Sequence, residues 1–220
     1  MLALCPLALL PSCTLLFTSG SGPDSGPPAD SMTPDAGADG SVTETFLISA
    51  SSDDVEEAAL DGDMSIGSSD LELGFDGDVL QIVGLRYTSV TIARNAAIQS
   101  ASIQFTVDST TEDDVTLTIH IQDTADGLTF TDDDGNLSSR ALNSDGVEWI
   151  PAPWLEDEAG AAQQSPDLAV LLQELVNRDD WVSGYSAVFV ISAEGAGSRS
   201  AQAFDEDGVP PVLNVTFTPP

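Results

Sequence analysis

Lysine is missing from this chain of 220 residues, and its whole basic complement consists of five arginines. The 37 aspartates and glutamates leave a formal net charge of −32 at pH 7. A chain with this charge repels the phosphate backbone and has no basic stripe that would release counterions, so nucleic acid is excluded as a partner. Anionic membrane headgroups are equally poor partners for the bare protein, which leaves a lipid anchor as its route to a membrane.

Cysteine is almost as scarce, and both cysteines, Cys5 and Cys13, stand close to the start of the chain. The rest of the chain therefore has no disulfide, no zinc–thiolate site and no cysteine nucleophile. The only histidine, His120, falls on the polar side of an alternating segment, and we expect a surface histidine rather than a catalytic base. No Walker loop, dinucleotide-binding glycine pattern, HExxH pair or GxSxG elbow is present. These absences favour a protein that is not an enzyme.

Residues 1–17, MLALCPLALLPSCTLLF, are apolar and carry no charge. Pro6 and Pro11 interrupt the stretch, so it predicts an export signal rather than a transmembrane helix, although the positively charged start of such signals is missing. Residues 10–13 (LPSC) resemble the lipobox of bacterial lipoproteins, which implies acylation of Cys13. Plain secretion and a retained anchor are the alternatives. We therefore expect the protein to be extracellular or on the outer surface of the cell, with or without a lipid anchor.

Residues 18–43 consist mainly of Gly, Ser, Pro, Asp and Ala, with scarcely any large apolar side chain. Such a segment cannot bury enough surface to offset the entropy lost on ordering, so we expect a flexible spacer. The following residues, 44–218, have the length of a single domain. Hydrophobic residues make up 41% of the chain and recur in this part in short runs, which is enough to build one core.

Short runs of the β type, separated by clusters of Gly, Asp, Asn and Ser, dominate residues 44–218. In residues 115–123 (VTLTIHIQD), apolar and polar side chains alternate, which predicts a half-buried strand with one wet face. The other clear runs are residues 69–75 (SDLELGF), 81–87 (QIVGLRY), 98–107 (IQSASIQFTV), 187–192 (AVFVIS) and 212–217 (VLNVTF).

One segment, residues 165–178 (SPDLAVLLQELVNR), has the helical period instead. Its apolar stripe consists of Leu168, Leu171, Leu172, Leu175 and Val176. We expect Ser165 to be the N-cap, with Pro166 at the first helical position and Asp167 near the positive end of the helix dipole. Many short strands with one amphipathic helix predict an all-β fold, a two-sheet antiparallel β-sandwich of the jelly-roll type.

A set of short motifs extends over residues 45–217. The motifs are residues 53–57 (DDVEE), 68–73 (SSDLEL), 83–87 (VGLRY), 100–105 (SASIQF), 137–140 (LSSR), 166–168 (PDL) and 173–178 (QELVNR), with Trp181. They resemble a family of extracellular bacterial jelly-roll β-sandwich modules, similar to carbohydrate-binding modules. Such modules tend to have a Pro-x-Gly turn where this chain has Ala93, Arg94 and Asn95, and asparagine also takes the left-handed conformation. The resemblance implies a sandwich fold and an extracellular location, and it leaves the ligand open.

The carboxylates have two interpretations. Charge of a single sign keeps a protein soluble and monomeric, and it suits folding in high salt, where repulsion is screened. Alternatively, some carboxylates hold structural Ca²⁺, which takes oxygen ligands. Because jelly rolls bring the two ends of the domain together, the ligands that we expect are Asp53, Asp54, Glu56, Asp205 and Asp207. Residues 132–136 (DDDGN) are a second candidate, but they lack the glutamate that completes an EF-hand loop, so a solvated turn is expected.

Arg86 and Arg140 draw attention because basic residues are so rare in this chain. We expect each to form a structural ion pair with a nearby carboxylate, with Glu57 or Glu72 as the partner of Arg86. Ligand binding is the alternative interpretation for both arginines.

Trp149 and Trp154 are the aromatic residues that a sugar-binding face would use, by stacking flat on pyranose rings. They flank residues 150–153 (IPAP), a rigid segment suited to presenting one indole outward. Core packing is the alternative for both. Trp181, directly after the helix, is expected to pack in the core.

These features predict a non-catalytic, monomeric surface module that binds a polysaccharide, cell-surface glycan or extracellular matrix. A purely structural or assembly domain of the cell surface is the alternative from a different class, and it would show no exposed aromatic platform. A glycan-active hydrolase would need a cleft with two convergent carboxylates, and among 37 acidic residues some suitably spaced pair arises by chance.

Overall fold

The structure is a computed structural model that describes residues 40–205 and 208–220. The leader at residues 1–17, with Cys13, lies outside the described residues, as do most of the spacer and Asp207. Among the described residues, no helix is both long and apolar enough to cross a bilayer.

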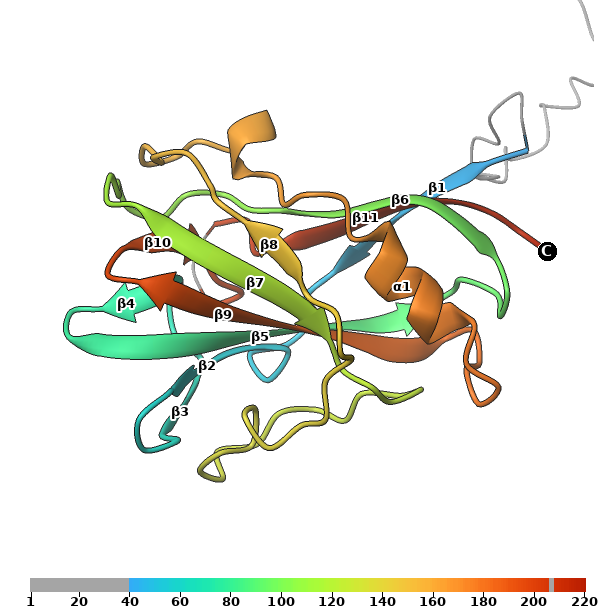
Figure 1. The fold of residues 1–220 in the computed structure, drawn as a ribbon, viewed down its shortest axis with the longest axis horizontal. Helices are drawn as coiled ribbons and strands as arrows, with labels where there is room; N and C mark the ends of the chain where they lie inside the picture. Colours follow the sequence, from blue (N-terminus) through green and yellow to red (C-terminus); the bar gives the residue numbers. More distant parts are fainter. Residues whose placement is uncertain (1–39, 206–207) are drawn as a thin grey trace, which may run out of the picture. The chain divides into compact units, whose positions relative to one another are not determined.

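The described residues form two antiparallel sheets (Figure 1). The smaller sheet has the order β1 (Val42–Leu47), β11 (Val212–Thr218), β6 (Ala97–Gln104). The larger, eight-stranded sheet follows the order β10 (Ser198–Gln202), β4 (Asp70–Asp76), β5 (Val79–Val90), β9 (Tyr185–Gly195), β7 (Val115–Ile121), β8 (Val147–Trp149), with β2 (Asp54–Ala58) on β5 and β3 (Met64–Ile66) on β2. This arrangement confirms the predicted all-β, two-sheet antiparallel sandwich.

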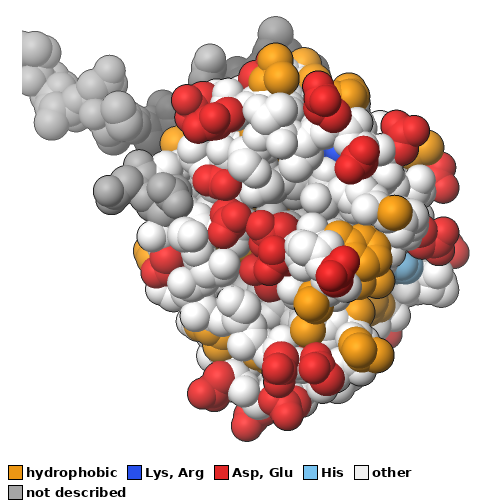
Figure 2. All heavy atoms as spheres, turned by 90° about the vertical axis from the view of Figure 1, so that its left-hand side faces the viewer, with side chains coloured by type: hydrophobic (Ala, Val, Ile, Leu, Met, Phe, Trp, Pro, Cys, Tyr) orange, Lys and Arg blue, Asp and Glu red, His pale blue; other side chains and the backbone are white. Residues whose placement is uncertain are grey.

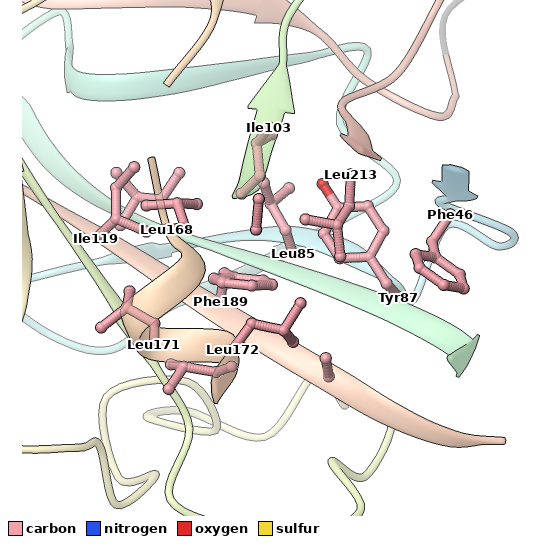
Figure 3. Close-up of a cluster of buried hydrophobic side chains, with 14 of the residues drawn as sticks. Phe46, Leu85, Tyr87, Ile103, Ile119, Leu168, Leu171, Leu172, Phe189 and Leu213 are labelled. Carbon is pink, nitrogen blue, oxygen red and sulfur yellow. The ribbon is translucent and has the colours of Figure 1, made fainter. Parts of the chain in front are cut away.

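Alternation of side chains along the strands builds the core. In β7, Val115, Leu117, Ile119 and Ile121 are buried, whereas the threonines and His120 between them are half-buried. In β11 the buried residues Leu213 and Phe217 point the same way as Val215. Figure 3 shows how side chains of both sheets and of the helix meet in this core.

The helix α1 (Ala169–Val176) packs on β6 and β7, and its predicted leucine stripe is buried as expected. Its predicted start was wrong, because Leu168 rather than Ser165 is the N-cap. The Ser165 hydroxyl instead accepts the backbone N–H of Ile103 at 2.9 Å. Asp167 accepts the N–H groups of Ala101 and Ala169. Residues 165–168 are thus bonded to the edge of β6, and the helix begins only after them.

All six predicted strands are present, within a few residues of the expected bounds. Asn95 has the predicted left-handed backbone, with φ at 63°. Strand β1 begins at Val42, inside the segment predicted as spacer. Five strands were not predicted: β1, β2, β3, β8 and β10. Strands β3 and β8 have only three residues, whereas β2 (DVEEA) and β10 (SRSAQ) are too polar to show an apolar alternation.

Candidate functional site

Residues 122–146, between β7 and β8, form a long connection that is anchored to the rest of the domain. Backbone N–H groups of the connection donate to the carbonyls of Ser52, Gly62 and Ser186. Connections of this length without regular structure are uncommon in compact domains, where they are usually functional or disordered. We call residues 122–140 the anchored loop, because they hold most of these contacts.

Arg140 organises the anchored loop from within. Its guanidinium donates to the backbone carbonyls of Leu128, Thr129 and Asn136. It also donates to the side-chain oxygens of Gln122 and Asn136, so all five N–H donors of the guanidinium have acceptors. The guanidinium carbon lies 4.3 Å from the centre of the Phe130 ring. The predicted ion pair was wrong, because carbonyl and amide oxygens of the loop occupy the donors instead.

A second hydrophobic cluster fixes the anchored loop to the outer face of the sheet. Phe130 and Leu137 are buried there against Val55, Val188 and Val190. The fit depends on Gly84 in β5, because a β-carbon at this position would lie 2.8 Å from Phe130 Cζ and 2.9 Å from Leu137 Cδ1. Glycine in the middle of a strand therefore marks the place where the loop approaches the sheet closely.

Arg86 supports the same loop from the sheet. Its Nη1 lies 2.6 Å from Oδ1 of Asp53, which is almost fully buried, and its Nε donates to the carbonyl of Gly127. A structural ion pair was predicted, but the partner is Asp53 and not Glu57 or Glu72. Glu57 Oε2 instead accepts the N–H groups of Leu137 and Ser138. Two of the five arginines, Arg86 and Arg140, thus form hydrogen bonds that hold the anchored loop.

A pocket of about 390 Å³ opens on the anchored loop. Its wall includes Gln122, Thr124, Asp126, Leu128, Asn136 and Arg140. Leu128 is 75% exposed and supplies an apolar surface among hydroxyl, amide and carboxylate groups. None of these residues was predicted from sequence as a ligand contact, apart from Asn136 in the second calcium candidate and the alternative for Arg140. The signal available was the run of Thr, Asp, Asn and Ser between two clear strands.

A larger pocket, of about 490 Å³, lies at the turns beside β2 and β4. Leu60, Phe75 and Val79 line it, together with Asp61, Asp63 and Asp78. Figure 2 shows the face toward which the β4–β5 turn points, with apolar side chains set among carboxylates. The side chains that line this pocket are apolar or acidic. They can accept hydrogen bonds from the hydroxyl groups of a ligand, but they cannot donate any.

Strand β2 separates the predicted calcium ligands onto two faces, because successive side chains of a strand point in opposite directions. Asp53 points toward Arg86 and the anchored loop. Asp54 accepts the N–H of Phe204, next to Asp205, whereas Glu56 accepts the N–H of Glu72. The described residues contain no group of three or more His, Cys, Asp or Glu arranged to hold a metal ion. The four predicted ligands that the structure describes, Asp53, Asp54, Glu56 and Asp205, therefore do not form one site.

Carboxyl groups from β2 and β4 meet directly. Glu72 is hydrogen-bonded through its side chain to Asp70 and Glu56, and burial followed by these two contacts raises its pKa from 4.5 to about 10. Burial also raises the pKa of Glu56. Ser200 donates to Asp70 and Asp108 at the edge of this group. Glu72 therefore holds a proton at neutral pH, which lets its carboxyl group bond to the neighbouring carboxyl groups.

Folding stability is expected to fall as the pH rises from about 5 to 9. The folded state keeps a proton on Glu72 that the unfolded chain releases above 4.5, so the stabilisation is complete below that pH and is lost toward pH 10. Glu72→Gln should flatten the dependence of Tm on pH and raise Tm at pH 8. Glu148→Gln, which removes an exposed charge from β8, is the matched control. An unchanged slope in Glu72→Gln would contradict this assignment.

The tryptophans lie in the core. Trp149 is 6% exposed and Trp154 is fully buried, and both indoles pack against Phe105 with ring centres 5.5 and 6.0 Å away. Trp181 is buried as predicted and donates to the carbonyl of Ile92. The sugar platform predicted at Trp149 and Trp154 is therefore wrong, because neither indole presents a face to a ligand.

Buried Arg199 holds the segment that leads to Trp154. It is 1% exposed and donates to the carbonyls of Pro151 and Ala152 on one side and of Asp113 on the other. Burial lowers its pKa from 12.5. This fixed position explains why the segment predicted to present an indole outward directs it into the core.

The two remaining sequence candidates are a histidine and an acidic loop. His120 is half-buried and packs against Gly146, where a β-carbon would lie 2.7 Å from the ring. In the loop 132–136, the side chains of Asp133 and Asn136 are hydrogen-bonded to the Thr131 hydroxyl. These bonds within the loop are those of a turn, as expected.

No family model matches the chain, and no curated protein matches its sequence.

Proposed function

We propose that the chain is a non-catalytic, extracellular module that binds a neutral glycan in the pocket of the anchored loop. The observation that carries the proposal is the rigid support of this loop by Arg86, Arg140 and Glu57. Binding residues tend to lie on loops positioned by a rigid scaffold, and a fold alone does not require such an anchored connection. The apolar leader at residues 1–17 supports export, and Cys13 supports a lipid anchor on the outer surface.

The chemistry of the pocket matches that of a sugar. Thr124 and Gln122 offer hydroxyl and amide groups, Asp126 offers a carboxylate, and Leu128 offers an apolar surface for C–H groups. Arg140 has no free donor for an anion, since all five are used within the loop. The net charge of −32 also opposes anionic polymers, which is why we assign a neutral glycan.

A non-catalytic role agrees with the geometry of the acidic residues. Glycoside hydrolases hold their two carboxyl groups roughly 5 Å or more apart, across the bond that they cleave. Glu56 and Glu72 are instead in direct hydrogen-bond contact outside the pocket of the anchored loop. Of the two carboxylates that line the pocket, Asp126 accepts the N–H of Ser186 and Asp133 accepts the Thr131 hydroxyl, so both are bonded within the protein.

A glycan array with the soluble domain from residue 41 onward tests the proposal. We expect retention on at least one neutral glycan, and a loss of affinity of about five- to tenfold in Leu128→Ala and Thr124→Val, which remove one pocket contact each. Leu155→Ala is the matched control, because Leu155 is also exposed but lies outside the pocket. Binding that both pocket variants retain in full would refute the assignment to this loop.

A structural or assembly domain of the cell surface is the second candidate. The burial of Trp149, Trp154 and Trp181 favours it, because the chain then lacks the exposed tryptophan platform expected of a sugar-binding face. A uniformly blank array would support this second candidate over glycan binding.

A further inference from the structure

Asp54 has a buried carboxylate oxygen without a partner. The residue is 3% exposed, and its Oδ2 accepts the N–H of Phe204 at 2.7 Å. Its Oδ1 is buried and has no hydrogen-bond partner among the described residues. A buried carboxylate oxygen left without a donor or a cation is costly, and such an exception in a folded protein calls for an explanation, of which a bound cation is one.

A second carboxylate comes to the same place from the far end of the domain. Asp205 follows directly after Phe204, whose backbone N–H donates to Asp54. The Asp205 Oδ1 accepts the Ser51 hydroxyl at 2.7 Å. Its Oδ2 lies near Gly67, 3.6 Å from the position of a β-carbon there. Two negative groups thus converge where no arginine pairs with either of them among the described ion pairs.

We propose that Asp54 and Asp205 are ligands of one structural Ca²⁺ ion that ties the segment before β11 to the start of β2. Carboxylate oxygens suit Ca²⁺, which completes its shell with backbone carbonyls and water and accepts irregular geometry more readily than Mg²⁺. Asp53 and Glu56, which were also predicted as ligands, are not part of this site because Arg86 and the Glu72 N–H occupy them. The site is independent of the glycan proposal and lies on a different set of residues.

The test is thermal unfolding of the soluble domain from residue 41 onward, after chelation and again with excess Ca²⁺. A ligand that binds only the folded state at about 100 times its Kd should raise Tm by roughly 5–10 °C for a domain of this size. Asp205→Asn and Asp54→Asn should both abolish this rise. Asp205 is exposed, so its variant is expected to fold even if Asp54→Asn does not.

Asp145→Asn is the matched control for general attraction of Ca²⁺ to a chain of charge −32, because Asp145 is an exposed aspartate on the connection before β8. It should keep the full Ca²⁺-dependent rise in Tm. The proposal is overturned if the unmodified domain shows no rise, or if Asp205→Asn keeps it. A rise lost in Asp133→Asn but kept in Asp205→Asn would place the ion in the loop 132–136 and would overturn it as well.

Discussion

Asp53→Ala is expected to lower the free energy of unfolding by about 2–4 kcal/mol, because it leaves Arg86 half-buried without its counter-charge. The pair is short, at 2.6 Å, and the Asp53 side chain is only 3% exposed. Asp53 also accepts the Ser49 hydroxyl. Burial and, after it, the nearby charge of Arg86 lower the pKa of Arg140. Removing the carboxylate therefore leaves two positive groups near each other. Urea unfolding measures the loss.

Two variants separate this effect from a general loss of charge. Asp179→Ala breaks an exposed ion pair with Arg94, and exposed pairs contribute less than about 1 kcal/mol, so this variant should be nearly neutral. Asp53→Ala combined with Arg86→Met should be less destabilised than Asp53→Ala alone, since the unpaired charge is gone. Equal losses in Asp53→Ala and Asp179→Ala would show that Arg86 does not need its partner.

The strands and the helix could be predicted because the side chains that form the core repeat at regular intervals. Alternation in residues 115–123 and the leucine stripe after Pro166 each reflect burial on one side, and both are confirmed. The N-cap could not be predicted in the same way. Ser165 has the side chain of a good cap, but whether it caps the helix or pairs with β6 depends on a strand about 60 residues earlier.

The site was harder to predict because its geometry depends on contacts between distant segments. In the sequence, Asp53, Asp54 and Glu56 resemble one group of ligands. Because side chains alternate along a strand, Asp53 lies on a different face from the other two. Trp149 and Trp154 are suited by type to a sugar platform, but type does not reveal that Arg199 holds their segment inward. Two features of the sequence hinted at the anchored loop: the glycine at position 84 within a strand, and the run of Thr, Asp, Asn and Ser after residue 122.

Arg140→Ala is expected to release the anchored loop. The variant removes five donors and the contact with Phe130, so three backbone carbonyls lose their partners, at a total cost of about 2–4 kcal/mol. Arg140→Lys should restore little, since one ammonium group cannot replace a planar fork with five donors. Arg94→Ala, which removes an arginine with an exposed pair, is the matched control and should leave the loop unchanged.

Amide hydrogen exchange shows most directly whether the connection after β7 is a rigid, preformed site. In the unmodified protein, the amides of Gly127, Phe130 and Leu137 should exchange as slowly as those of β7, because all three are hydrogen-bonded to the domain. In Arg140→Ala they should exchange much faster relative to β7. Rapid exchange at these amides in the unmodified protein, within seconds and independent of Arg140, would contradict a preformed pocket and the binding role proposed for it.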